Sequence, residues 1–117
     1  MNLVVDIGNT LIKVAVVEGA DVLLSQAFAS ADEMRVVALL EQFPALRQAI
    51  VASTGEPTSE VAGRLRRAGL RVLEMTSLTP TPIGNDYHTP ATLGVDRLAA
   101  AVAAVEVMGC RDCLVVD

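Results

Sequence analysis

The chain opens with short apolar runs that are interrupted by turn-forming residues. Apolar residues make up most of residues 2–6, 11–18 and 22–30, and the intervening segments are Ile7-Gly8-Asn9-Thr10 and Gly19-Ala20-Asp21. Connections this short join antiparallel neighbours, so the pattern predicts three consecutive antiparallel strands. Gly8 and Asn9 tolerate positive φ, which makes them the predicted turn of the first hairpin.

After residue 30 the apolar period changes to that of a helix. Ser30 and Glu33 have the spacing of a capping box, which predicts a helix start. The apolar face predicted for this helix, which ends before Pro44, consists of Met34, Val37 and Leu40. The predicted hairpins therefore end here, and a region in which helices alternate with strands begins.

The remaining pattern alternates strands with helices. It predicts a strand at 49–53, a helix at 57–68 closed by Gly69, a strand at 70–75, an ordered proline-rich loop at 76–90, an Ala-rich helix from Thr92 to about Met108, and a strand at 112–117. The expected face of the Ala-rich helix is Leu98, Val102 and Val105. Alternation of this kind is typical of parallel pairing through right-handed crossovers.

These elements define an α/β fold class. Their chain order, βββαβαβα with a mixed five-stranded sheet, is that of a ribonuclease-H-like domain, here covering residues 1–109. Residues 113–117 echo residues 2–6 in apolar character and in the closing aspartate. We therefore expect residues 110–117 to begin a second such domain with its first strand.

Composition excludes several classes of function. With 14 acidic and 9 basic residues the net charge is -5, which disfavours a nucleic-acid partner. The N-terminus lacks a signal-peptide pattern and no apolar run is long enough to cross a membrane, so we expect a cytoplasmic location without membrane contact. Cys110 and Cys113 have redox or metal-binding spacing, but two reduced cytosolic thiols fit better, since no second pair completes a zinc site.

The first hairpin carries candidate phosphate-binding chemistry. Asp6 ends a strand, where a carboxylate can hold Mg²⁺ directly or through water. Gly8 permits close approach of the backbone to an anion, successive N–H groups in a tight turn form an anion site, and Thr10 and Lys13 add a hydroxyl and a positive charge. An ordinary hairpin with a Gly-Asn turn has the same local pattern.

A second candidate constellation is Asn85-Asp86-Tyr87-His88-Thr89-Pro90-Ala91-Thr92-Leu93-Gly94-Val95-Asp96-Arg97. Asp96 and Arg97 fall in the first turns of the Ala-rich helix, where N–H groups and the helix dipole favour anions. A carboxylate there can deprotonate a substrate hydroxyl, and a guanidinium can pair with a substrate carboxylate. Alternatively, Asp96 only complements the helix dipole and Arg97 is solvated.

The two motifs together resemble those of the type III pantothenate kinases, which are actin-like ATPases, and the resemblance extends over essentially the whole chain. It implies ATP-dependent phosphorylation of pantothenate, in coenzyme A biosynthesis, with Asp96 as general base. It implies ATP-phosphate contacts by Asp6, Ile7, Gly8, Asn9, Thr10, Leu11, Ile12 and Lys13. It implies pantothenate binding by Tyr87, Gly94, Val95, Asp96 and Arg97.

The same resemblance implies bound cations, a dimer partner and a second domain. Asp6 would bind Mg²⁺, and Asp117 would begin a second phosphate motif and hold a monovalent cation, K⁺ or NH₄⁺. The family is dimeric, so we expect a homodimer with the Ala-rich helix near its interface. The family's second domain would follow Asp117, so the expected activity belongs to the full-length protein rather than to these 117 residues.

Three other functions compete with this one. A ribonuclease-H-like nuclease shares the strand order, but it needs a basic substrate face, and Lys13 is the only lysine. A non-catalytic regulatory homologue is disfavoured by the intact Asp6, Asp96 and Arg97. Another actin-like small-molecule kinase is disfavoured by residues 87–97.

Overall fold

The computed structural model describes residues 1–32, 34–54, 59–109 and 111–116 of the chain. The backbone divides into two compact units, Met1–Glu74 and Met75–Asp117. The first unit contains the sheet with two helices, and the second contains the long loop and the Ala-rich helix.

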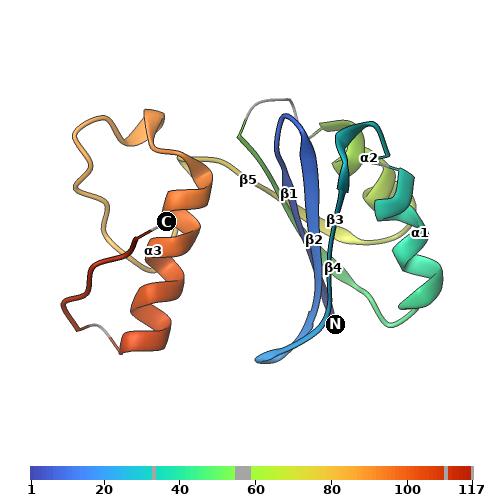
Figure 1. The fold of residues 1–117 in the computed structure, drawn as a ribbon, viewed down its shortest axis with the longest axis horizontal. Coiled ribbons are helices and arrows are strands. Elements are labelled where there is room, and N and C mark those ends of the chain that lie inside the picture. The colour runs from blue at the N-terminus through green and yellow to red at the C-terminus, as the bar shows by residue number, and fades with distance from the viewer. Residues whose placement is uncertain (33, 55–58, 110, 117) are drawn as a thin grey trace. The chain divides into compact units, whose positions relative to one another are not determined.

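The first unit is built on a mixed five-stranded sheet, as expected (Figure 1). Its strands are β1 (Asn2–Ile7), β2 (Leu11–Glu18), β3 (Asp21–Ala29), β4 (Gln48–Ser53) and β5 (Arg71–Met75). Their spatial order is β3-β2-β1-β4-β5. Strand β1 pairs antiparallel with β2 and parallel with β4, and β2 pairs antiparallel with β3, so the two predicted hairpins are confirmed.

Strand β1 occupies the centre of the sheet, and its alternation decides which side chains are buried. Leu3, Val5 and Ile7 are 7% exposed or less, whereas the residues between them are more accessible. Successive side chains of a strand point to opposite faces, so this register sends the aliphatic side chains to one face and Asp6 to the other.

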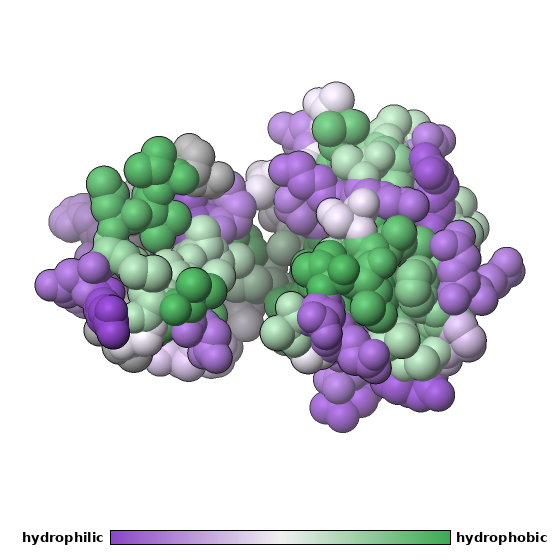
Figure 2. Space-filling view, turned by 60° about the horizontal axis from the view of Figure 1, so that its bottom comes forward, coloured by the Kyte–Doolittle hydropathy of each residue, from purple (hydrophilic) through white to green (hydrophobic). Residues whose placement is uncertain are grey.

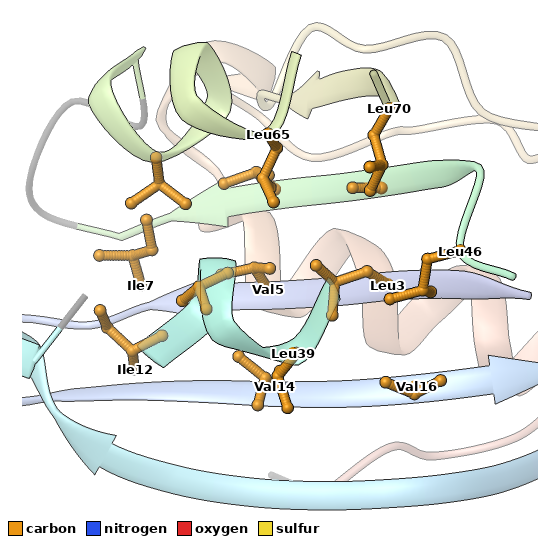
Figure 3. Close-up of a cluster of buried hydrophobic side chains, with 14 of the residues drawn as sticks. Leu3, Val5, Ile7, Ile12, Val14, Val16, Leu39, Leu46, Leu65 and Leu70 are labelled. Carbon is orange, nitrogen blue, oxygen red and sulfur yellow. The ribbon is translucent and has the colours of Figure 1, made fainter. Parts of the chain in front are cut away.

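Two helices cover the aliphatic face (Figures 1 and 3). They are α1 (Met34–Gln42), which follows the short 3₁₀ helix Ser30–Asp32, and α2 (Ser59–Arg67). Their buried side chains join those of the strands in one core: Leu3, Val5, Ile7, Ile12, Val14, Val16, Phe28, Val36, Leu39, Leu46, Ala49, Val51, Val61, Leu65 and Leu70. The core is almost entirely aliphatic, in keeping with the low aromatic content of the chain.

The predicted face of α1 was only partly right, because Leu40 is partly buried against the core but Met34 is exposed. Val36 and Leu39 are the buried residues of this helix, whereas Met34 is 54% exposed and Val37 is only partly buried. The predicted residues and the buried residues both recur at helical spacing, so the apolar period alone does not distinguish the two faces. Packing against the sheet decides which face is buried. The predicted capping box includes Glu33, which lies outside the described residues.

The second unit begins with the proline-rich segment, which has no strand or α-helix up to residue 94. A 3₁₀ turn at Pro90–Thr92 precedes α3 (Val95–Met108), so the α-helix starts later than the predicted Thr92. Gly109 ends α3 in the left-handed region, with φ 67° and ψ 47°, and its N–H bonds the carbonyl of Val105. Glycine adopts this conformation without a Cβ penalty, which explains the predicted end of the helix.

The strand expected at the C-terminal end is not formed: residues 111–116 have no regular secondary structure. A strand needs a neighbour for its N–H and C=O groups, and no described residue pairs with this segment. Leu114 and Val116 are 88% and 86% exposed, and green hydrophobic side chains appear on the surface of this unit in Figure 2. The second-domain boundary at residue 110 therefore stays a prediction.

Two further expectations concern the cysteines and membrane contact. Cys113 is an exposed free thiol, and Cys110 lies outside the described residues. Among the helices that the structure describes, none combines the length and the apolar character needed to cross a bilayer.

Replacing a fully buried leucine should destabilise the first unit. Leu65 on α2 has 0% exposure and belongs to the core, so Leu65→Ala removes contacts and leaves a cavity. We expect a loss of about 2–5 kcal/mol in the free energy of unfolding, measured by urea denaturation. The matched control Leu78→Ala, at a position 72% exposed, should change it by less than about 0.5 kcal/mol. Equal effects of the two substitutions would contradict this core.

Candidate active site

The turn between β1 and β2 is closed by its own backbone. Ile7 and Ile12 face each other as the last register pair, and the Gly8 N–H donates to the Leu11 carbonyl at 2.9 Å. A Cβ on Gly8 would lie 3.1 Å from that same carbonyl oxygen. Gly8 is not among the glycines with positive φ, so the predicted reason for glycine was wrong. Close backbone approach, rather than a left-handed conformation, favours glycine at this position.

The carbonyl groups of the turn are bonded to neighbouring elements. The Ile7 carbonyl accepts from the Thr54 N–H at 3.2 Å. Ser30 donates its hydroxyl to the Gly8 carbonyl and its N–H to the Thr10 carbonyl, both at 3.0 Å. These bonds tie the turn to the ends of β3 and β4.

The N–H groups of Asn9 and Thr10 have no acceptor among the described residues. Both residues are exposed, so a ligand can reach them. Adjacent backbone N–H groups in a tight turn create a concave, positively polarised anion site. The turn thus has the donors that the sequence predicted for a phosphate.

Asp6 and Lys13 form the charged part of this region. They are register partners on β1 and β2, on the face opposite Val5 and Ile7. Lys13 Nζ lies 4.0 Å from Asp6 Oδ2, and the two side chains are 68% and 40% exposed. An exposed pair at this distance is weak, so both groups remain accessible to a ligand.

The groups around Asp6 suit an open magnesium site, in which water and substrate oxygens complete the coordination, rather than a site enclosed by protein ligands. Magnesium binds carboxylate oxygens but keeps several waters and commonly shares phosphate oxygens of a substrate. Asp6 offers one accessible carboxylate beside the N–H groups of the turn. Within the part of the chain that the structure describes, no group of three or more His, Cys, Asp or Glu residues is placed to enclose a metal.

Not every residue of the first motif presents its side chain to this region. Ile7 and Ile12 are 7% and 1% exposed and belong to the aliphatic core. Their side chains are therefore not available for phosphate contacts. Leu11 is 45% exposed, and its carbonyl already accepts the turn-closing bond from Gly8.

The second motif lies in the second unit, at the start of α3. Tyr87, Asp96 and Arg97 are exposed, and Gly94 and Val95 are partly buried. Asn85 Oδ1 accepts from the Tyr87 N–H at 3.0 Å, and the Ser77 hydroxyl donates to the Ala91 carbonyl at 3.0 Å, which brings the two ends of the loop together. The loop before α3 is therefore ordered by its own polar residues.

Gly94 shapes the surroundings of the Asp96 carboxylate. It is the N-cap of α3, and its carbonyl accepts from the Leu98 N–H at 3.1 Å. The Asp96 side chain folds back over it, so that a Cβ on Gly94 would collide with Asp96 Oδ1. Glycine at this position gives the carboxylate its place at the positive end of the helix.

Arg97 lines an open hollow of about 310 Å³ within the second unit, together with Ala100, Ala101 and Val115. Three of these side chains are small or aliphatic, so the guanidinium is the group that can recognise an anion there. Arginine suits a carboxylate because its planar donors bind two oxygens at once.

The two carboxylates belong to different units, Asp6 to the first and Asp96 to the second. Asp117 lies outside the described residues. Ser30 and Thr54 were missed at the sequence level as contacts of the turn. Their positions directly after β3 and β4, beside the end of β1, were the available signal.

The mixed sheet and its helices form an α/β arrangement consistent with an actin-like or ribonuclease-H-like domain. A family model for type III pantothenate kinase matches residues 2–117. The chain belongs to this family.

Curated relatives named type III pantothenate kinase include those of Christiangramia forsetii, 36% identical over the whole chain, and Phocaeicola vulgatus, 35% identical. A third, from Bacteroides fragilis, is 38% identical, also over the whole chain. In each case the alignment covers 48% of the relative. The chain thus spans about half the length of the curated relatives that it matches.

Adding a methyl group at Gly94 should move the Asp96 carboxylate without unfolding the helix. The colliding atom is the far end of a side chain that can rotate, so we expect Gly94→Ala to change the Asp96 rotamer. A crystal structure of the variant measures the shift, and thermal unfolding should stay near that of the parent protein. Gly84→Ala is the control, because nothing lies within 4 Å of its added Cβ. An unmoved Asp96 carboxylate would refute the close contact.

Proposed function

We propose that the full-length protein containing this chain transfers the γ-phosphoryl group of ATP to the terminal hydroxyl of pantothenate. The products are 4'-phosphopantothenate and ADP, in the first step of coenzyme A biosynthesis. The observation that carries this proposal is the family match over residues 2–117, which includes both motifs. The geometry supports it, because the turn after β1 offers anion donors and the start of α3 presents a carboxylate next to a guanidinium.

The phosphate groups of ATP belong at the first hairpin in this proposal. The N–H groups of Asn9 and Thr10 donate to phosphate oxygens, with Gly8 allowing the close approach. Lys13 adds a positive charge, and the accessible Asp6 carboxylate would hold Mg²⁺. The bound ion would neutralise charge on the phosphate oxygens, which is the main need of phosphoryl transfer besides positioning.

Pantothenate belongs at the start of α3. Arg97, with its planar donors, pairs with the pantothenate carboxylate, and Tyr87, Gly94 and Val95 line the site. Asp96 accepts the proton of the terminal hydroxyl while that oxygen attacks the γ-phosphorus and ADP leaves.

The remaining expectations complete the proposal. A monovalent cation, K⁺ or NH₄⁺, is held with the help of Asp117 at the start of a second phosphate motif. The second actin-like domain follows from residue 110 onward, the protein works as a homodimer in the cytoplasm, and α3 lies near the dimer interface. The accessibility of Asp6, Asp96 and Arg97 favours an enzyme over a non-catalytic regulatory homologue.

Removing the proposed base should stop turnover. In a coupled assay of ADP release, the wild-type protein should show pantothenate-dependent activity. Asp96→Asn should lower kcat by about 10²–10⁴-fold and leave the KM for pantothenate within about threefold, because the amide keeps the shape but cannot accept the proton. Asp86→Asn, an exposed aspartate of the same unit, is the matched control and should retain turnover. Near-normal kcat in Asp96→Asn would exclude it as the base.

Removing the Asp6 carboxylate should weaken the response to magnesium. An amide is a poorer ligand for a hard cation, so Asp6→Asn should raise the Mg²⁺ concentration for half-maximal activity by about tenfold or more. A magnesium titration of initial rates measures this change. Asp21→Asn, at the exposed start of β3, provides the control. A magnesium dependence identical to wild type would place the ion elsewhere.

A further inference from the structure

Ser30 contacts the β1–β2 turn at two points, although it lies outside both motifs. It follows β3 directly and begins the 3₁₀ helix Ser30–Asp32. Its N–H donates to the Thr10 carbonyl and its hydroxyl donates to the Gly8 carbonyl, both at 3.0 Å. The hydroxyl bond is partly buried and joins residues 22 positions apart.

The hydroxyl bond fixes more than the Gly8 carbonyl. That carbonyl and the Asn9 N–H belong to the same peptide group, which is planar and trans, so they point in opposite directions. Holding the carbonyl toward Ser30 therefore aims the Asn9 N–H away from Ser30. A hydrogen bond to the carbonyl also polarises the peptide group, which strengthens its N–H as a donor.

The other hydrogen bonds of the turn do not hold the Gly8 carbonyl. The Gly8 N–H is held by the Leu11 carbonyl, and the Thr10 carbonyl is held by the Ser30 backbone. Only the Ser30 hydroxyl holds the Gly8 carbonyl among the described residues. The peptide group between Gly8 and Asn9 would be free to rotate if that hydroxyl were absent.

We propose that Ser30 is a positioning residue of the phosphate turn: through its hydroxyl bond to the Gly8 carbonyl it orients the Asn9 N–H toward an oxygen of the ATP phosphates. Ser30 itself does not touch the nucleotide. This role rests on the proposed function, because it assigns ATP phosphate to the turn.

The test uses the full-length protein with three substitutions. Ser30→Ala removes the hydroxyl but keeps the backbone bond to Thr10, and Ser30→Thr restores a hydroxyl. Ser25→Ala is the matched control, because Ser25 is an exposed serine on β3, the strand that Ser30 follows. Initial rates are measured with varied ATP and varied pantothenate, and ATP binding is measured directly by calorimetry well below the unfolding temperature.

We expect Ser30→Ala to lower kcat/KM for ATP and the binding constant for ATP by about 3- to 10-fold, the effect of one hydrogen bond. The KM for pantothenate should stay within about twofold of wild type, and Ser30→Thr should recover most of the ATP affinity. Ser25→Ala should match wild type. A merely structural role would instead lower the unfolding temperature and disturb both substrates alike.

Three results would overturn the role of Ser30: an unchanged ATP affinity in Ser30→Ala, equal losses for ATP and pantothenate, or no recovery in Ser30→Thr. Failure of the proposed function looks different. In that case wild-type protein would bind ATP but would not phosphorylate pantothenate, and the calorimetric comparison would still decide the role of Ser30. Absence of ATP binding by the wild-type protein would overturn both.

Discussion

The alternation of side chains along β1 is the constraint on which the first unit depends. Because β1 is hydrogen-bonded to β2 on one side and to β4 on the other, its register cannot slip without turning Leu3 and Val5 out of the core. The same register places Asp6 on the opposite face, directly across from Lys13. Burial of the aliphatic side chains under α1 and α2 therefore also fixes the position of the carboxylate.

The phosphate turn follows from the end of this strand. Three of its carbonyls accept hydrogen bonds from neighbouring segments: that of Ile7 from Thr54, and those of Gly8 and Thr10 from Ser30. Buried or partly buried carbonyls need partners, and here those partners come from residues that follow β3 and β4. The N–H groups of Asn9 and Thr10 have no acceptor among the described residues, which suits an anion. Such preorganised donors lower the cost of orienting a phosphate.

At the start of α3, the constraint is the space available to the Asp96 carboxylate. A carboxylate near a helix N-terminus is stabilised by the dipole, but the turn that leads into the helix crowds it. Gly94 removes that crowding by having no Cβ, so Asp96 can lie back over the helix start while Arg97 lines an open hollow. In the proposed reaction the first unit positions phosphate and the second positions the acceptor, which explains why neither motif alone identifies the chemistry.

The amino-acid sequence by itself determined most of the element types and the position of the hairpin turn, because these depend on the period of the apolar residues. It also determined the glycine that closes α3, because that depends on local backbone preference. It also contained both motifs, from which the resemblance to the family was recognised. Tertiary structure decided which face of α1 is buried, since Met34 and Val36 fit the helical period equally well and only the sheet distinguishes them. It also decided that residues 111–116 form no strand, because pairing requires a neighbour that local sequence cannot supply. The bond from Ser30 to Gly8 likewise appeared only in three dimensions, since it joins residues brought together by strand pairing and not by any spacing along the chain.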